Sequence, residues 1–137
     1  MLELPAAVVD EVVAACLAGY PLEVCGLLAG SVTADGSSAL VASSTTTPNA
    51  AASARVYTVE PVALLRADRA ADDAGLTLCG VWHSHTHTDA VPSPTDVAAA
   101  PDPGWWYLLV SLRDVEPKLR AWRIRDGVVE EDAVAVR

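Results

Sequence analysis

The sequence is poor in three features that point to common classes of protein: excess basic charge, a basic leader and long apolar runs. Nine lysines and arginines stand against eighteen aspartates and glutamates, a formal net charge of −9 at pH 7. This charge repels phosphate backbones and anionic lipids, so we expect neither a nucleic-acid nor a membrane partner. The N-terminus lacks a basic leader, and no run approaches the roughly 20 apolar residues of a membrane span. We therefore expect a soluble, cytoplasmic protein.

Cysteine is also scarce. Cys16, Cys25 and Cys79 are odd in number and far apart, so they form neither a disulfide framework nor a CxxC metal pair. We expect three buried thiols in a reducing compartment.

Repeats, linkers and low-complexity tracts are absent as well. With 137 residues and 52% hydrophobic composition, the chain is predicted to form a single domain over residues 1–137 with one core.

The spacing of apolar residues predicts an α/β domain with a mixed sheet. Two amphipathic helices are expected, over residues 3–19 and from Pro61 to about Gly75. Strands are expected over residues 24–32, 39–45, 55–58, 76–85, 105–112, 118–125 and 128–136. The first two of these strands are separated by turn residues and should form a hairpin.

Residues 80–96 contain the side chains that most strongly indicate a chemical function, a possible metal site. Strand alternation places His83, His85 and His87 on one face. Two imidazoles two residues apart can converge on one zinc ion, which accepts nitrogen and carboxylate oxygen in a tetrahedral shell. The prolines at 92 and 94 turn the chain away from the strand, so Asp96 can fold back towards the histidines.

Three other interpretations of this segment remain open from the residues alone. Ser93 and Asp96, with proline between them, also fit a helix-capping box, a role compatible with metal binding. His83, His85 and His87 could instead form an all-histidine zinc site. Finally, the histidines could lie on the surface and bind nothing.

A hydrolytic zinc site also needs a general base, and spacing does not name it. Eligible acids include Asp10, Glu11, Glu23, Asp35 and Glu60. Glu23 is the preferred candidate, because it lies between Leu22 and Val24 where an apolar strand begins, an unusual place for a merely solvated acid. The alternative for Glu23 is a capping or snorkelling role.

The order of these residues resembles the signature of the JAMM, or MPN+, metallopeptidases. That signature is a glutamate, then His-Ser-His, then seven residues, then Ser-x-x-Asp. Here it corresponds to Glu23, His83-Ser84-His85, Ser93 and Asp96. The surrounding segments PLEVCGLLAG, PNAAASARVYTVEP and GVWHSH are similar to the family as well, over roughly residues 3–125. The HEXXH motif of other zinc hydrolases is absent.

This resemblance implies a fold and a set of roles. The fold would be a JAMM/MPN-like (cytidine-deaminase-like) single domain, a mixed, mostly antiparallel sheet flanked by helices. His83, His85 and Asp96 would bind Zn2+, and Glu23 would accept a proton from the attacking water and pass it to the leaving amine. Ser93 would help to hold the oxyanion. Imidazole and carboxylate also accept iron, cobalt or nickel, so zinc is an inference from chemistry and resemblance.

One residue departs from many family members. Thr86 stands where the deubiquitinases of the family have proline. In this respect the chain is similar to a bacterial branch that acts on small ubiquitin-like sulfur carrier proteins, and most of all to its CysO-cysteine type. The resemblance implies hydrolysis of a carrier–cysteine amide in cysteine biosynthesis. The alternatives are a peptidase or isopeptidase that removes other adducts, and an inactive MPN scaffold. The oligomeric state stays open, a homodimer included.

Several further side chains could contribute to such a site. His87 could bind a substrate carboxylate or a second metal, although a solvent-facing role is favoured. Arg55 and Arg66 are the basic residues expected nearest the site, and either could meet a terminal carboxylate, although ordinary surface arginines are more common. Trp105, Trp106 and Tyr107 are expected mostly to pack in the sheet, although one indole at the rim could line a groove for an extended carrier tail.

Overall fold

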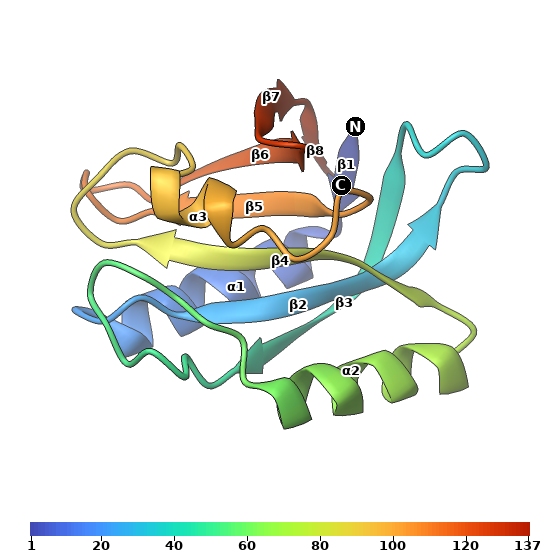
Figure 1. Ribbon diagram of the computed structural model, residues 1–137, viewed down its shortest axis with the longest axis horizontal. Coiled ribbons are helices and arrows are strands. Elements are labelled where there is room, and N and C mark those ends of the chain that lie inside the picture. The colour runs from blue at the N-terminus through green and yellow to red at the C-terminus, as the bar shows by residue number, and fades with distance from the viewer.

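The computed structural model describes residues 1–137, which form eight strands and three helices (Figure 1). The strands are β1 (Leu2–Leu4), β2 (Cys25–Val32), β3 (Ala39–Thr47), β4 (Thr77–His85), β5 (Trp106–Ser111), β6 (Lys118–Arg125), β7 (Val128–Asp132) and β8 (Val134–Val136). The helices are α1 (Ala6–Gly19), α2 (Pro61–Asp73) and α3 (Pro94–Ala98). None of these helices has the length and apolar character needed to cross a membrane.

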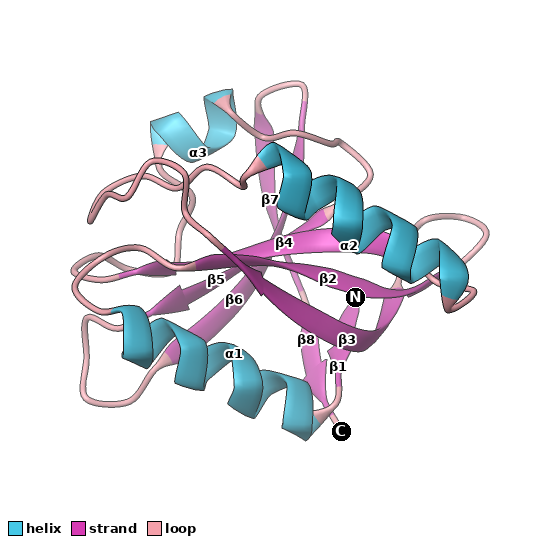
Figure 2. Ribbon diagram, turned by 90° about the horizontal axis from the view of Figure 1, so that it is seen from below, coloured by secondary structure: helices cyan, strands magenta, loops and turns pink.

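All eight strands belong to one sheet, in the order β7-β6-β5-β4-β2-β3-β1-β8. Four neighbouring pairs are antiparallel, and the pairs β1–β3, β1–β8 and β4–β5 are parallel. Helix α1 covers one face, whereas α2 and α3 lie over the other (Figure 2). The mixed, mostly antiparallel sheet flanked by helices confirms the predicted fold class.

Each face of the sheet has its own apolar core. On the α1 side, Val8, Val12 and Cys16 recur every four residues and are buried against the sheet, as a helix that packs on one side requires. The indole of Trp82 belongs to the same core and lies close over Gly26, where a Cβ atom would come within 2.3 Å of the ring. The opposite core, under α2 and α3, supports the candidate site described below.

The expected helix over residues 3–19 was wrong at its start, because Leu2–Leu4 form strand β1. Leu2 and Leu4 are both fully buried, and Pro5 separates the strand from α1. Proline has no N–H and disfavours helical geometry in the residue before it, so the helix begins only after Pro5. The last expected strand, 128–136, is instead two strands. β7 pairs with β6, whereas β8 pairs in parallel with β1.

The expected strand over residues 55–58 was also wrong, since the segment forms a loop with a single bridge between Asn49 and Val59. The Asn49 side chain supplies the hydrogen bonds that a strand partner would otherwise provide. Its amide donates to the carbonyls of Glu23 and Val56, each at 3.0 Å, and its oxygen accepts from the N–H of Thr58 at 2.9 Å. The loop therefore satisfies its backbone through a side chain, which strand propensity does not reveal.

Candidate metal centre

Two histidines at the carboxyl end of β4 form the base of the site. β4 is a central strand between β2 and β5, so His83 and His85 are buried, with 1% and 4% exposure. Strand alternation places both rings on one face, where their Nε2 atoms lie 3.1 Å apart. Ser84 points to the opposite face, and its Oγ accepts a hydrogen bond from the Val24 N–H at 2.8 Å.

Asp96 reaches the same point from helix α3. Its Oδ2 lies 3.2 Å from His83 Nε2 and 3.1 Å from His85 Nε2, and its side chain is buried. Helix α3 holds it there through a capping box, in which Ser93 Oγ accepts from the Asp96 N–H at 3.1 Å and Asp96 Oδ2 accepts from the Ser93 N–H at 2.8 Å. Capping and convergence on the histidines thus occur together, as the sequence allowed.

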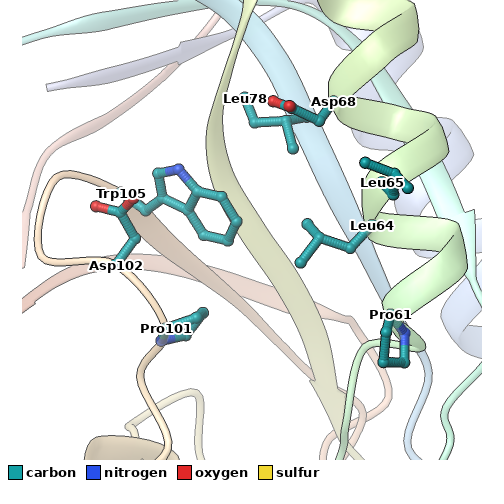
Figure 3. A pocket seen from close by; sticks show the side chains of 8 residues that line it. All are labelled: Pro61, Leu64, Leu65, Asp68, Leu78, Pro101, Asp102 and Trp105. Carbon is teal, nitrogen blue, oxygen red and sulfur yellow. The ribbon is translucent and has the colours of Figure 1, made fainter.

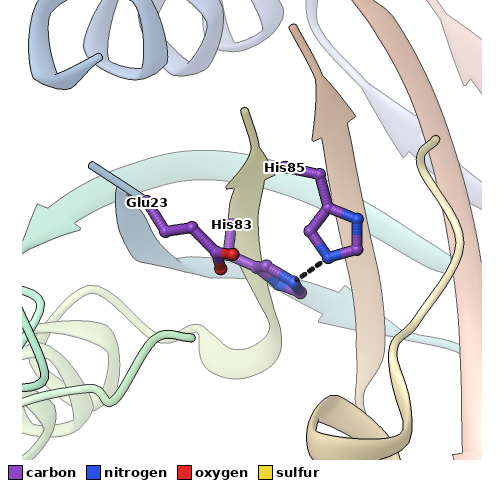
Figure 4. Close-up of side chains that lie close together, drawn as sticks. All are labelled: Glu23, His83 and His85. Carbon is purple, nitrogen blue, oxygen red and sulfur yellow. Dashed lines mark hydrogen bonds between the residues drawn. The ribbon is translucent and has the colours of Figure 1, made fainter. Parts of the chain in front are cut away.

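Glu23 approaches this group from the start of β2. The pairing of Cys25 with His83 brings the end of β4 beside the residues that precede β2, and the Glu23 carboxylate faces the two imidazoles (Figure 4). One oxygen of Glu23 and one nitrogen of each histidine all lie within 4.8 Å of one another. The side chain is 4% exposed, and its Oε1 has no hydrogen-bond partner.

The three donor groups His83, His85 and Asp96 fit a tetrahedral metal ion whose fourth coordination position is free of protein ligands. A zinc ion about 2.0–2.1 Å from its nitrogen ligands would separate its ligand atoms by roughly 3.3 Å, close to the observed 3.1, 3.1 and 3.2 Å among His83, His85 and Asp96. His85 Nδ1 donates to the Asp89 carbonyl at 2.7 Å, which leaves the Nε2 lone pair free for a metal. The unpaired Glu23 oxygen is suited to a water bound beside the ion.

Burial and hydrogen bonding together set the charge states of these groups. Burial raises the pKa of Glu23 from 4.5 to about 7, with opposing contributions from His85, which lowers it, and Asp96, which raises it. Burial lowers the pKa of His83 and so favours the neutral imidazole that binds metals. Burial alone would raise the pKa of Asp96, but hydrogen bonds with His83 and His85 outweigh it and hold that pKa well below its ordinary value.

Three further residues support the site, and sequence reasoning assigned no role in it to Tyr57, Asn49 or the Ser84 side chain, although Ser84 lies within the His-Ser-His signature. Tyr57 stacks on the His83 ring, with centroids 4.0 Å apart and planes inclined by 21°. Asn49 holds the Glu23 carbonyl, and Ser84 holds the next residue of the chain, Val24. For Tyr57 and Asn49 the only sequence signals were an aromatic residue and an asparagine in a turn-rich segment, and neither identifies its distant partner.

The structure separates the alternatives that the sequence left open. His87 is exposed and lies away from the other histidines, with its Nε2 3.2 Å from the Tyr20 hydroxyl, so it does not complete an all-histidine set. Among the other acids, Asp10 and Glu11 are exposed on α1, Glu60 caps α2 through both carboxylate oxygens, and Asp35 accepts hydrogen bonds from Thr33 and Ser37. Of the acids considered as the base, only Glu23 reaches the histidines.

Comparison with known proteins decides the family. The sequence-family model described as prokaryotic homologs of the JAB domain matches residues 5–125. The chain belongs to this JAB family. The CysO-cysteine peptidase of Mycobacterium tuberculosis (strain ATCC 25618 / H37Rv) is 37% identical over 137 residues, which cover 99% of this chain and 91% of the relative.

Two further proteins show how far the similarity extends. The desampylase of Haloferax volcanii is 39% identical over 92 residues, 66% of this chain and 63% of the relative. The solution structure of protein DSY2949 from Desulfitobacterium hafniense superposes with a TM-score of 0.91 at 28% identity, covering 100% of this chain and 93% of the other. Together with the buried Glu-His-His group, membership of the JAB family identifies the chain as an enzyme of the peptidase class whose site fits a metal ion.

Proposed function

We propose that this JAB-family protein is a zinc-dependent hydrolase that cleaves the amide bond between a small ubiquitin-like sulfur carrier protein and a C-terminal cysteine. The convergence of His83, His85 and Asp96 beside the unpaired Glu23 carboxylate carries the proposal for hydrolysis. The similarity over almost the full chain to a CysO-cysteine peptidase supports the choice of substrate. Release of free cysteine would place the reaction in cysteine biosynthesis.

The proposed chemistry assigns one task to each group. His83, His85 and Asp96 hold the zinc ion, which when bound supplies Lewis acidity to the scissile carbonyl and the attacking water. Glu23 accepts the proton of that water at its free carboxylate oxygen and then delivers it to the leaving amine. Ser93 Oγ accepts from the Asp96 N–H, so its own O–H is free to donate to the oxyanion that develops on the carbonyl.

A groove beside the site supports a protein substrate with an extended tail. A hollow of about 410 Å³ lies between α2 and the segment before β5, lined in part by Leu64, Pro101 and Trp105 (Figure 3). A second hollow of about 180 Å³ shares these three residues and reaches Tyr57, which stacks on His83. We propose that the carrier's tail lies along this groove, with the half-buried Trp105 at its rim.

Other parts of the proposal concern the whole chain. Residues 1–137 would form a single domain, since β1 and β8 from the two ends of the chain pair in one sheet. Three free, buried cysteines are compatible with a reducing, cytoplasmic location.

An inactive scaffold would not require this buried set of donor groups, so we favour catalysis. Cleavage of other ubiquitin-like conjugates is the second candidate, supported by the similarity to a desampylase.

The substrate is tested by incubating the zinc-loaded protein with a sulfur carrier bearing a C-terminal cysteine and with the same carrier joined to the side-chain amine of a lysine peptide. Mass spectrometry should show release of cysteine at a rate well above that of the lysine conjugate. Exclusive cleavage of the lysine conjugate would replace the proposed substrate by the second candidate. Cleavage of neither conjugate would contradict both.

The pH dependence follows from the raised pKa of Glu23. The base must be ionised, so protonation of Glu23 removes activity and kcat/KM should fall as the pH is lowered. Because burial raises the pKa from 4.5 to about 7 and a bound cation draws it down again, the acidic limb should lie between these two values. A pH series of kcat/KM measures it. A limb at or below 4.5, or one that persists in Glu23→Gln, would contradict this assignment.

A further inference from the structure

A second binding feature lies beside the proposed catalytic residues. A pocket of about 470 Å³ opens next to the candidate centre, and only one of its eight lining residues is hydrophobic. The lining residues are Glu23, Ala54, Arg55, His85, Thr86, His87, Thr88 and Ser93. Three of these are the proposed base, a proposed metal ligand and the proposed oxyanion donor. A molecule in this pocket therefore touches the reacting groups.

The loop that carries Arg55 is held from both sides of the centre. The Glu23 N–H donates to the Ser53 carbonyl at 2.8 Å, and Thr86 Oγ1 donates to the Ala54 carbonyl at 3.3 Å. Ser53 Oγ also accepts from the Arg55 N–H at 3.0 Å. The two residues before Arg55 are therefore hydrogen-bonded to the proposed base and to Thr86, the neighbour of His85. These bonds fix the Arg55 backbone at the pocket.

The Thr86 hydroxyl anchors this loop beside the candidate centre. The hydrogen bond from Thr86 Oγ1 to the Ala54 carbonyl requires a side-chain donor, and Thr86 Oγ1 also lies 2.8 Å from His87 Nδ1. If the Thr86 hydroxyl donates to Ala54, it accepts from His87 Nδ1–H, and His87 Nε2 accepts from the Tyr20 hydroxyl at 3.2 Å. Proline has neither a hydroxyl nor an N–H and could not hold the loop in this way.

The guanidinium of Arg55 has no partner in the protein. No acid lies within ion-pair distance of it, and its side chain makes no hydrogen bond. Arg113, Arg120 and Arg137 each pair with an acidic residue, whereas the exposed Arg66 and Arg69 do not. Of all the arginines, only Arg55 lines this pocket. In a chain of net charge −9, an unpaired arginine in the pocket of the reacting groups is suited to an anion on the substrate, and its planar donors match a carboxylate.

The reaction itself indicates which carboxylate this is. Glu23 delivers its proton to the leaving amine, so the released amino acid lies on the Glu23 side of the centre. Its α-carboxylate is only two covalent bonds from that amine, but it is free only when the released residue is the last of the chain. We propose that Arg55 binds this α-carboxylate and thereby selects adducts that end in a single amino acid. This inference rests on the proposed hydrolase function.

The test compares two synthetic peptides that end in Gly-Gly-Cys, one with a free carboxylate and one with a carboxamide. Both carry the same thiol, so any contact of the thiol with zinc cancels in the comparison. The wild-type enzyme should cleave the free acid with a kcat/KM about 10- to 100-fold above that of the amide, the range expected for hydrogen bonds to a charged group. Arg55→Gln should bring this ratio close to one, whereas Arg55→Lys should retain part of it.

Arg66→Gln is the matched control, because Arg66 is an exposed arginine on α2 that does not line this pocket. Its ratio of acid to amide cleavage should equal that of the wild type. A merely structural role of Arg55 would lower both rates together and leave their ratio unchanged, so an unchanged ratio in Arg55→Gln would overturn the inference. Equal cleavage of both peptides by the wild type would overturn it as well.

Binding measured without turnover separates this inference from the proposed function. In the Glu23→Gln background, calorimetric titration should show tighter binding of the acid than of the amide, and adding Arg55→Gln should remove the difference. If the acid binds more tightly but the wild type cleaves neither peptide, the proposed function fails and the carboxylate site stands. If the acid binds no more tightly than the amide, the Arg55 inference is wrong, whatever the enzyme cleaves.

Discussion

Replacement of Glu23 by glutamine should lower kcat by about 10²- to 10⁴-fold, the range attributed to general acid–base catalysis. Glutamine has almost the same shape, so the fold and the metal content should stay the same. The amide cannot accept the proton of the attacking water, and the Glu23 Oε1 that would do so has no other partner in the protein. The measurements are steady-state kinetics and zinc content by elemental analysis.

Glu11→Gln is a suitable control for this variant, since Glu11 is an exposed acid on α1 outside the candidate centre. It should behave like the wild type. Full activity in Glu23→Gln would remove Glu23 from the role of base. Loss of zinc in that variant would instead make Glu23 a ligand, which its position within 4.8 Å of both histidine nitrogens makes a specific alternative.

Replacement of Asp96 by asparagine should weaken zinc binding by more than about 100-fold, because loss of even an outer-shell partner typically costs 10- to 100-fold. Asparagine keeps an oxygen that accepts from the Ser93 N–H, so the capping box and helix α3 should persist. What it loses is the negative charge next to His83 and His85. Equilibrium dialysis against zinc should give about one ion per wild-type chain, and circular dichroism checks the fold.

The control for this second variant is Asp89→Asn. Asp89 is exposed, and its side chain pairs with Arg113 at 2.9 Å, while only its backbone carbonyl contacts His85. Zinc affinity should therefore change little in Asp89→Asn. An Asp96→Asn protein with wild-type affinity would show that a different residue is the third ligand, and activity that survives complete removal of zinc would contradict the metal-dependent mechanism.

Much of the fold was predictable because local patterns decide it. The spacing of Val8, Val12 and Cys16 gave the body of α1, and the Glu60-Pro61 pair located the start of α2. Errors occurred where partners distant in sequence decide the structure. Residues 2–4 form a strand only because β3 and β8 lie on either side of it, and Tyr57 lies in a loop because Asn49 bonds the backbone around it.

The amino-acid sequence alone determined the spacing of the candidate centre's groups along the chain. Alternation along a strand places His83 and His85 on one face, and Pro94 opens the short capped helix α3 that carries Asp96. These features follow from covalent geometry within a few residues, so they can be inferred from the residues themselves. Family resemblance supplied the roles that this geometry does not specify.

Only the tertiary structure decided which distant groups join them. The pairing of β2 with β4 brings Glu23 to the histidines, and the bonds from Glu23 and Thr86 to the 53–54 carbonyls place Arg55 at the same pocket. The physical reason is that strand order and loop position are set by burial of both faces of the sheet and by hydrogen bonds between segments far apart in sequence, which no local pattern encodes.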